Sequence, residues 1–288
     1  MEPLRREKFN QSITRRVRRV IDDYNLLEDG DKIAVALSGG KDSVLTLHLL
    51  NKFQNDYNLQ LVAITIDEGI EGYREEGLEI ARVNAAKLGI KLIEKSFLYE
   101  YKFELDQIAD EYKSSCIPCG VFRRHLINKT AHQLGVNKLA TGHNLDDEIQ
   151  SFLMSFARAD FRRFSKFGPK LKQIHPLLIP RIKPLWKIPE KDVGTWAILN
   201  DVPVHFAECP YSNKSLRAKI KSYLNNLEED HPGTKMAILE SFEKTFKIQD
   251  TIVKLVECER CGEPTSLNMC KACEMQEKIR NKNCYCHR

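Results

Sequence analysis

The chain has 288 residues, of which 42% are hydrophobic, and its formal net charge at pH 7 is +5. This length suits one α/β domain with a small appendage, and the apolar content suits a globular core. The longest apolar runs, 32–37 and 59–66, are far shorter than the roughly 20 residues of a membrane-spanning helix. The charged N-terminus has no apolar segment behind it, so we expect no secretory signal and no membrane contact, and hence a cytoplasmic protein.

A basic helix is predicted at the start of the chain, from about Arg5 to Tyr24, and we assign residues 1–29 to it. A turn-rich segment at 28–31 ends the helix. Residues 15–19 read Arg-Arg-Val-Arg-Arg. Such a run fits an RNA-binding surface because cations attract phosphates, and it equally fits a solvated helix face.

Alternating strand and helix patterns follow, and they predict a parallel α/β sheet over residues 30–210. The strand candidates are 32–37, 61–67, 91–97 and 138–143, and helices are expected at 44–50 and 74–88. Gly89 follows the second helix, as a C-terminal glycine does. Strands that alternate with helices form sheets covered on both faces, and ligands bind beyond the carboxyl ends of the strands.

A glycine turn with the sequence Ser-Gly-Gly-Lys-Asp-Ser occupies residues 38–43, between the first strand and a helix. Backbone amides at a helix N-terminus bind anions, and this turn adds the Lys41 cation and the hydroxyls of Ser38 and Ser43. The spacing differs from a Walker A loop, which requires GxxxxGK[ST]. We therefore predict a phosphate-binding turn of another kind, with an ordinary glycine turn as the alternative.

Nine cysteines in a chain without a secretion signal indicate thiolate or metal chemistry rather than disulfides. Cys116 and Cys119 form a CxxC motif between the third and fourth strands, and Cys209 follows the apolar segment 204–206. Three thiolates can hold a metal or a cluster and leave one position open. A zinc site or inert buried thiols are the alternatives.

A second basic stretch carries interleaved aromatic residues. It contains Arg158, Arg162, Arg163, Lys166, Lys170 and Lys172 together with Phe161, Phe164 and Phe167. Phosphates attract cations and unstacked bases stack on flat rings, so the stretch fits a nucleic-acid surface. A loop anchored by buried phenylalanines is the other interpretation.

The C-terminal part is predicted to be helical over 211–256, with helices at 216–227 and 234–256, and to end in a zinc ribbon with a tail at 257–288. Two CxxC motifs separated by eight residues are typical of a closed tetrahedral zinc site, which would fold this small module. The four ligands are Cys258, Cys261, Cys270 and Cys273. Cys284, Cys286 and His287 are interpreted as a disordered tail.

The turn at 38–43 resembles the pyrophosphatase loop of the N-type ATP pyrophosphatases, the PP-loop superfamily. These enzymes split ATP between its α and β phosphates and adenylate a substrate oxygen. The resemblance implies an adenine nucleotide alpha-hydrolase-like fold and a catalytic role for Asp42, exerted through Mg²⁺. It implies nucleotide contacts at Ala36, Leu37, Ser38, Gly39, Gly40, Lys41, Asp42, Ser43, Ile66, Gly142 and Asp147.

The cysteine pattern resembles the tRNA 2-thiolation branch of this superfamily. The resemblance implies that Cys116, Cys119 and Cys209 hold a [4Fe-4S] cluster whose fourth iron carries the sulfur, with Cys116 and Cys209 counted as catalytic. It also implies that Arg123 stabilises phosphate charge. A cluster-free alternative places a persulfide on Cys116 or Cys119, resolved by Cys209, because a CxxC thiol at a helix start has a depressed pKa.

The C-terminal ribbon is similar to that of the uridine thiolases and is lacking in the bacterial cytidine thiolases. The family usually carries another cysteine knuckle before the first basic helix, and this sequence starts after the place where it should stand, so the knuckle is either absent or truncated. Segments 67–74, 119–124 and 156–160 look closest to the archaeal and eukaryotic wobble-uridine thiolases, so tRNA position 34 is preferred over uridine 54 and cytidine 32.

The predicted function is therefore that of an ATP-dependent tRNA sulfurtransferase, which adenylates the C2 oxygen of a uridine and replaces it with sulfur. An amide-forming ATP pyrophosphatase would leave the cysteines at 116, 119 and 209 dispensable. A non-catalytic zinc-ribbon RNA-binding protein would release no pyrophosphate. The sulfur donor, either sulfide or a ubiquitin-like thiocarboxylate protein, and a homodimeric state are both left open by the sequence.

Overall fold

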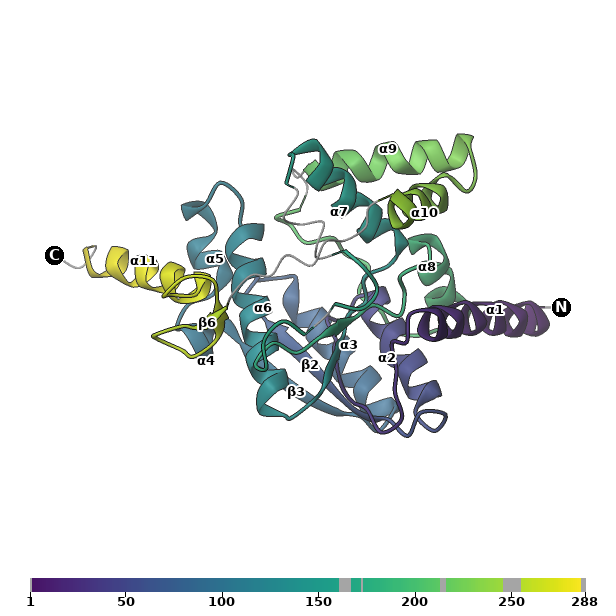
Figure 1. The fold of residues 1–288 in the computed structure, drawn as a ribbon, viewed down its shortest axis with the longest axis horizontal. Coiled ribbons are helices and arrows are strands. Elements are labelled where there is room, and N and C mark those ends of the chain that lie inside the picture. The colour runs from purple at the N-terminus through teal and green to yellow at the C-terminus, as the bar shows by residue number, and fades with distance from the viewer. Residues whose placement is uncertain (1, 161–166, 172, 213–215, 246–254, 286–288) are drawn as a thin grey trace.

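The computed structural model describes residues 2–160, 167–171, 173–212, 216–245 and 255–285 (Figure 1). The N-terminal and C-terminal helices lie at opposite ends of the long axis (Figure 1). In chain order the elements are α1 (Glu2–Asp23), β1 (Lys32–Ala36), α2 (Lys41–Phe53), β2 (Gln60–Asp67), α3 (Arg74–Lys87), β3 (Lys91–Ser96), α4 (Phe97–Tyr101), α5 (Leu105–Ile108), the 3₁₀ helix η1 (Ala109–Glu111), α6 (Cys116–Gln133), β4 (Lys138–Ala140), α7 (Leu145–Ala157), β5 (Arg181–Ile182), α8 (Glu190–Leu199), α9 (Leu216–Asp230), α10 (Thr234–Thr245), β6 (Val256–Glu257), β7 (Pro264–Thr265) and α11 (Lys271–Tyr285).

The main sheet has the strand order β3-β2-β1-β4-β5, and each pair of neighbours is parallel. The order changes direction at β1, which pairs with β2 on one side and β4 on the other. Such a switch point opens a crevice beyond the carboxyl ends of the strands, where α/β proteins bind ligands. The glycine turn at 38–43 leaves β1 at this position. The predicted parallel α/β fold is thereby confirmed.

The alternation of side chains along the strands divides the core into two layers. Ile33 and Val35 of β1 face a cluster that includes α1, α2 and α8, whereas Ala34 faces a second cluster with α4, α6 and α11. Successive strand residues point to opposite faces, and in a sheet covered on both faces each side is apolar. Ala63 and Ile64 of β2 divide between the clusters in the same way. Helices therefore cover both faces of the sheet.

The four predicted strands and the first helices are confirmed to within a few residues. Several elements of the domain were not predicted, among them β5, α6, α7 and α8. Strand β5 has only two residues, too few for a periodic pattern. Helix α6 contains Pro118 and Gly120 in its first turns, where proline is tolerated because the first amides need no helical partner.

The helices α9 and α10 pack with α7 into a unit beside the sheet (Figure 1). Leu224 of α9 and Leu239 of α10 are buried in the larger cluster. The prediction of one helix over 234–256 is wrong at its end. Helix α10 ends at Thr245, residues 246–254 lie outside the described part, and Val256 pairs with Thr265 in the two-stranded sheet β6-β7.

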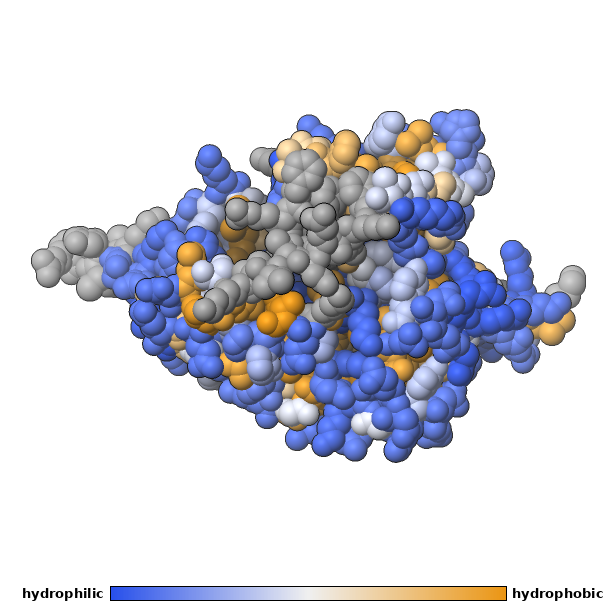
Figure 2. All heavy atoms as spheres, viewed as in Figure 1, coloured by the Kyte–Doolittle hydropathy of each residue, from blue (hydrophilic) through white to orange (hydrophobic). Residues whose placement is uncertain are grey.

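The basic run on α1 is divided between packing and solvent. Val17 is fully buried, Arg16 forms an ion pair with Asp192, and Arg18 pairs with Asp56 and lies over the Phe53 ring. Arg15 and Arg19 are exposed. Most of the visible surface of α1, at the right of the view, is hydrophilic (Figure 2). The run therefore serves partly to attach the helix, as well as to present charge.

Most of the second basic stretch, 161–166 and Lys172, lies outside the described residues. Phe167 is buried and packs on Phe242, so it does not offer a free ring for stacking. Lys170 donates to the carbonyl of Asn25. At these two positions the structure agrees with an anchored loop. In the described part of the chain, no helix has the length and apolar character required to cross a membrane.

Candidate functional site

The phosphate turn (residues 38–43) is shaped by close backbone approaches. Gly39 has a φ of +87°, and a Cβ there would lie 2.1 Å from the carbonyl oxygen of Gly77 on α3. A Cβ on Gly142, after β4, would lie 2.7 Å from the backbone of Asp42 and Ser43. Only glycine fits at such positions. The turn is thus clamped between α3 and the loop that precedes α7.

The charged residues of the turn are held by ion pairs. The Lys41 ammonium lies 2.9 Å from the Asp42 carboxylate and 2.9 Å from Glu190 at the start of α8. Burial lowers the pKa of Lys41, but the two carboxylates raise it by more, so the side chain stays protonated. Asn144 donates to Asp42 over 2.7 Å, and Lys221 of α9 pairs with Glu190 at 3.0 Å. The turn therefore presents a fixed cation beside a fixed carboxylate.

Arg74 connects the end of β2 with the phosphate turn. Its buried guanidinium donates to the carbonyls of Ile66 and Ser38, at 2.8 and 2.6 Å, and pairs with Glu68 at 3.0 Å. Glu68 also lies 3.5 Å from Arg123, whose side chain is 46% exposed. Burial lowers the pKa of Arg123, but the Cys119 thiol and Glu68 raise it by more. Arg123 is therefore a cation anchored through Glu68.

A cavity of about 350 Å³ joins the phosphate turn to the three cysteines that the sequence singled out. Its walls combine charged, aromatic and thiol groups, contributed by Ser38, Gly40, Lys41, Asp42, Glu68, Ile70, Tyr73, Arg74, Leu105, Ser115, Cys116, Cys119, Arg123, Glu190, His205, Phe206, Ala207, Glu208, Cys209, Tyr211 and Ser212. Residues almost a hundred positions apart thus meet beside one turn. The three cavity cysteines (Cys116, Cys119 and Cys209) all line this cavity.

The cavity cysteines differ in exposure. Cys116 begins α6 and is exposed, Cys119 is buried one turn later, and Cys209 is half-buried. Burial raises the pKa of Cys119 to about 11 and also raises the pKa of Cys209. The depressed pKa on which the persulfide alternative relied is not found at Cys119. Burial outweighs the helix start at this thiol.

Several residues expected at the nucleotide do not line the cavity: Ala36, Leu37, Gly39, Ser43, Ile66, Gly142 and Asp147. The side chains of Leu37 and Ile66 are buried in the core, so only their backbones could reach a ligand. Asp147 closes the capping box of α7 and pairs with Arg217 at 3.1 Å. Burial raises the pKa of Asp147 to about 6. These residues shape or border the turn.

Sequence reasoning assigned no role to Glu190, His205 or Phe206, and it placed Arg74 only within a segment expected near the adenine. Glu190 follows Lys41 by 149 positions, so no local motif links them. His205 donates its backbone amide to the Gly39 carbonyl at 2.9 Å, and its ring contacts Tyr73. The available signal was the apolar segment 204–206 before Cys209, which resembles a short strand. That segment does form a parallel bridge, between His205 and Gly40.

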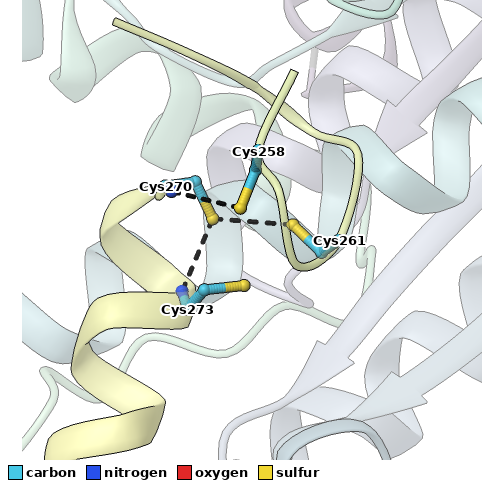
Figure 3. A group of neighbouring side chains, drawn as sticks. All are labelled: Cys258, Cys261, Cys270 and Cys273. Carbon is cyan, nitrogen blue, oxygen red and sulfur yellow. Dashed lines mark hydrogen bonds between the residues drawn. The ribbon is translucent and has the colours of Figure 1, made fainter. Parts of the chain in front are cut away.

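A second sulfur site lies in the C-terminal module (Figure 3). The four Sγ atoms of the ribbon cysteines (Cys258, Cys261, Cys270 and Cys273) lie within 4.8 Å of one another. The amide of Cys270 donates to Cys258 Sγ at 3.2 Å, and the amide of Cys273 to Cys270 Sγ at 3.4 Å. Within the described ranges, no other group of three or more His, Cys, Asp or Glu ligand atoms is as close. The four thiols fit one tetrahedral metal ion.

The ribbon module packs on α6, the helix that begins with two cavity cysteines. His125 of α6 places Nε2 3.6 Å from Cys261 Sγ and Nδ1 2.7 Å from the Tyr101 hydroxyl. Asn128 donates to Glu263 at 2.8 Å, and Met275 and Ile279 of α11 share a core with Phe122. The metal-binding ribbon therefore braces the helix that carries Cys116 and Cys119.

A glycine turn at the switch point of a parallel sheet, clamped by close glycines and charged by Lys41 and Asp42, defines a protein of the nucleotide-activating PP-loop class. The family model for the PP-loop domain matches residues 9–227. The chain belongs to this family and, within it, to the tRNA 2-thiolation proteins.

Two curated relatives illustrate the similarity. The tRNA 2-thiolation protein NcsA of Haloferax volcanii is 38% identical over 295 aligned residues, which cover 95% of this chain and 92% of that protein. Cytoplasmic tRNA 2-thiolation protein 1 of Saccharomyces cerevisiae (strain S288c) is 34% identical over 268 residues, which cover 88% of this chain and 75% of that protein.

A solved structure is similar over nearly the whole chain. It is the U34-tRNA thiolase NcsA from Methanococcus maripaludis with its [4Fe-4S] cluster. The TM-score is 0.83 at 34% sequence identity, and the match covers 95% of this chain and 89% of that one.

Proposed function

We propose that the chain is an ATP-dependent tRNA-uridine 2-sulfurtransferase that acts on the wobble uridine. The observation that carries this proposal is the single cavity shared by the phosphate turn and the cavity cysteines. An enzyme that only formed amides would have no use for three thiols beside its nucleotide. The names of the relatives support tRNA as the substrate, and the name of the similar Methanococcus structure supports position 34.

In the nucleotide step, the turn binds the pyrophosphate part of ATP. The first amides of α2 have no helical partner and point toward an anion, and Lys41 adds a positive charge. Asp42 is the carboxylate placed to hold Mg²⁺, which a triphosphate requires. The uridine C2 oxygen attacks the α phosphorus, the α–β phosphate bond breaks, and pyrophosphate leaves. Arg123 stabilises the charge that builds up on the α phosphate.

In the sulfur step, the activated C2 carbon accepts sulfur and AMP leaves. The three cavity cysteines suit a cluster with three protein ligands, because they line one cavity and their Sγ atoms are farther apart than those of the ribbon cysteines. A [4Fe-4S] cluster held by these cysteines would leave one iron without a protein ligand, where a sulfide from the donor could bind and serve as the nucleophile. Arg123 and Lys41 then stabilise the negative charge of the departing AMP.

The ribbon cysteines are proposed to hold Zn²⁺, because four thiolates close a tetrahedral site and leave no open position. The sulfur donor, sulfide or a thiocarboxylate protein, would reach the cavity at its exposed cysteine, Cys116. The yeast relative is named a cytoplasmic protein, which supports a reaction in the cytoplasm.

The test uses anaerobically purified protein, reconstituted with iron and sulfide, and a tRNA transcript with uridine at position 34. With Mg-ATP and sulfide, we expect 2-thiouridine by mass spectrometry, and no product from a transcript with cytidine at 34. Asp42→Asn should abolish both pyrophosphate release and thiolation. Asp201→Asn is the matched control, because Asp201 is exposed, lies outside the cavity and has a φ of 50° that asparagine tolerates.

Three outcomes would contradict the proposal in different ways. No 2-thiouridine from the wild-type protein would rule out the thiolase function. Product from the cytidine-34 transcript would move the substrate to another position. Undiminished nucleotide turnover on a small amine acceptor, with cavity cysteines replaced, would favour an amide-forming enzyme.

A further inference from the structure

The inference concerns Phe206, an aromatic side chain that is 58% exposed although it lines the cavity. Its backbone neighbour is fixed: His205 bridges Gly40 in parallel, donates its amide to Gly39, and packs its buried ring on Tyr73. In this extended segment the His205 side chain points inward and the Phe206 side chain points outward, as alternation along a strand requires. The amide hydrogen bond and the bridge of His205 therefore place the backbone of Phe206 next to the phosphate turn.

The position of Phe206 along the chain is informative. The segment meets the phosphate turn at His205 and reaches the third cavity cysteine at Cys209. In the proposed reaction one carbon is activated beside the turn and attacked beside the cysteines. The base that contains this carbon must lie between these two places, along the wall that Phe206 occupies.

The chemistry of the wall separates Phe206 from its neighbours. Lys41 and Arg123 are cations suited to phosphates. Among the aromatic rings of the wall, Tyr73 packs on His205 and Tyr211 donates its hydroxyl to Asp106, whereas the uncharged ring of Phe206 is 58% exposed. A uracil that leaves the anticodon stack loses its stacking partners, and proteins replace them with aromatic rings. An exposed ring beside phosphate-binding groups thus suits one nucleotide, because the ring can stack on the base while the cations bind the phosphate.

We propose that Phe206 stacks on the extruded uracil of the substrate tRNA and positions its C2 oxygen between the phosphate turn and the cavity cysteines. This proposal rests on the thiolase function proposed above. Phe206 is a positioning residue for the base, and the bond changes remain those of the two steps already described.

The experiment measures thiolation by the reconstituted protein with tRNA and ATP varied separately. Replacing a stacking ring by alanine weakens base binding roughly 5- to 150-fold. We expect Phe206→Ala to lower kcat/KM for tRNA within this range, without a change in the KM for ATP. Phe206→Trp should retain activity, and Phe206→Leu, which keeps the bulk without the flat face, should resemble the alanine variant. Tyr99→Ala is the control, because Tyr99 is 79% exposed and lies outside this cavity.

A tRNA carrying 2-aminopurine at position 34 gives a second measurement, independent of turnover. Binding to the wild-type protein should quench its fluorescence by stacking, and binding to Phe206→Leu should not. Leucine as good as phenylalanine in both measurements would overturn the inference while leaving the thiolase function intact. A raised KM for ATP with an unchanged KM for tRNA would overturn it by assigning the ring to adenine. A wild-type protein that forms no 2-thiouridine would overturn the function and the inference together.

Discussion

The cavity cysteines and the ribbon cysteines use the same side chain for different ends. The ribbon set has four thiols within 4.8 Å of one another, two of which accept backbone amide bonds. The cavity set has three thiols on the wall of a hollow of about 350 Å³, beside a cationic turn. Four close thiolates satisfy a metal completely, whereas three leave a coordination position for chemistry.

The difference teaches that surroundings decide the role of a CxxC motif. Both sets contain CxxC motifs, and one motif in each set begins a helix. The two sets differ in the number of ligands and in what lies beside them. The first ribbon motif lies beside a second CxxC motif, which completes four ligands. The cavity motif lies beside one distant cysteine and the phosphate turn. Changing single residues should therefore affect the two sets differently.

The largest effect is expected for Cys209→Ala, which removes one of three ligands. Removing a residue that hydrogen-bonds to a metal ligand already lowers metal affinity or activity about 10- to 100-fold. Removing a ligand itself should therefore reduce thiolation at least about 100-fold. The iron–sulfur absorbance of the reconstituted protein should fall, while its zinc content stays unchanged. Cys284→Ala, outside both sets, should keep activity. Full thiolation by Cys209→Ala would show that the cavity set has no chemical role.

A smaller effect on thiolation is expected for Cys261→Ala, which opens the ribbon site. Zinc content, measured by metal analysis, should fall to zero, because a structural zinc module unfolds when one of its metal ligands is removed. Thiolation should fall about tenfold, the smaller effect seen when a residue acts on a metal site indirectly, because α6 loses the packing of the ribbon against it. Cys261→His should retain zinc and activity, because Cys₃His sites are also closed. An effect as large as that of Cys209→Ala would erase the proposed division between the sets.

The smallest effect is expected for His125→Gln, which changes only the contact between the ribbon and α6. His125 lies 3.6 Å from Cys261 Sγ and is held by the Tyr101 hydroxyl, so its imidazole can donate to the thiolate. Chelator competition should show zinc affinity reduced about 10-fold or more, with thiolation changed less than twofold. His132→Gln, an exposed substitution on the same helix, should leave zinc affinity unaltered. Equal zinc affinities for the His125→Gln and His132→Gln variants would show that His125 does not contribute to zinc binding.

Local patterns carried most of the predicted fold. The strand at 32–37 and the turn at 38–43 are contiguous, so one short stretch contains both the periodicity and the motif. The ribbon cysteines were equally readable, because their spacing alone defines a tetrahedral site. Helix α6 was missed because its buried side chains include the polar Asn128 and Thr130 beside Leu126, so no apolar face with helical spacing stands out in the sequence.

Long-range contacts between charged residues were not predictable from this sequence. Arg74 binds the Ser38 carbonyl and Glu190 pairs with Lys41, but each pair is formed by folding and has no fixed spacing. Burial is a second property that spacing does not reveal. It raises the pKa of Cys119 to about 11, although a thiol in the first turn of a helix is ordinarily expected to be acidic.

Glu190 gives the arrangement of charges a further meaning. The Lys41 ammonium has two anionic partners, Asp42 and Glu190, and Glu190 also pairs with Lys221 of α9. A triphosphate must compete with these carboxylates for the same ammonium. If a phosphate displaced Glu190 from Lys41, the Glu190 carboxylate would keep its ion pair with Lys221. One glutamate side chain thus links the phosphate turn directly to helix α9.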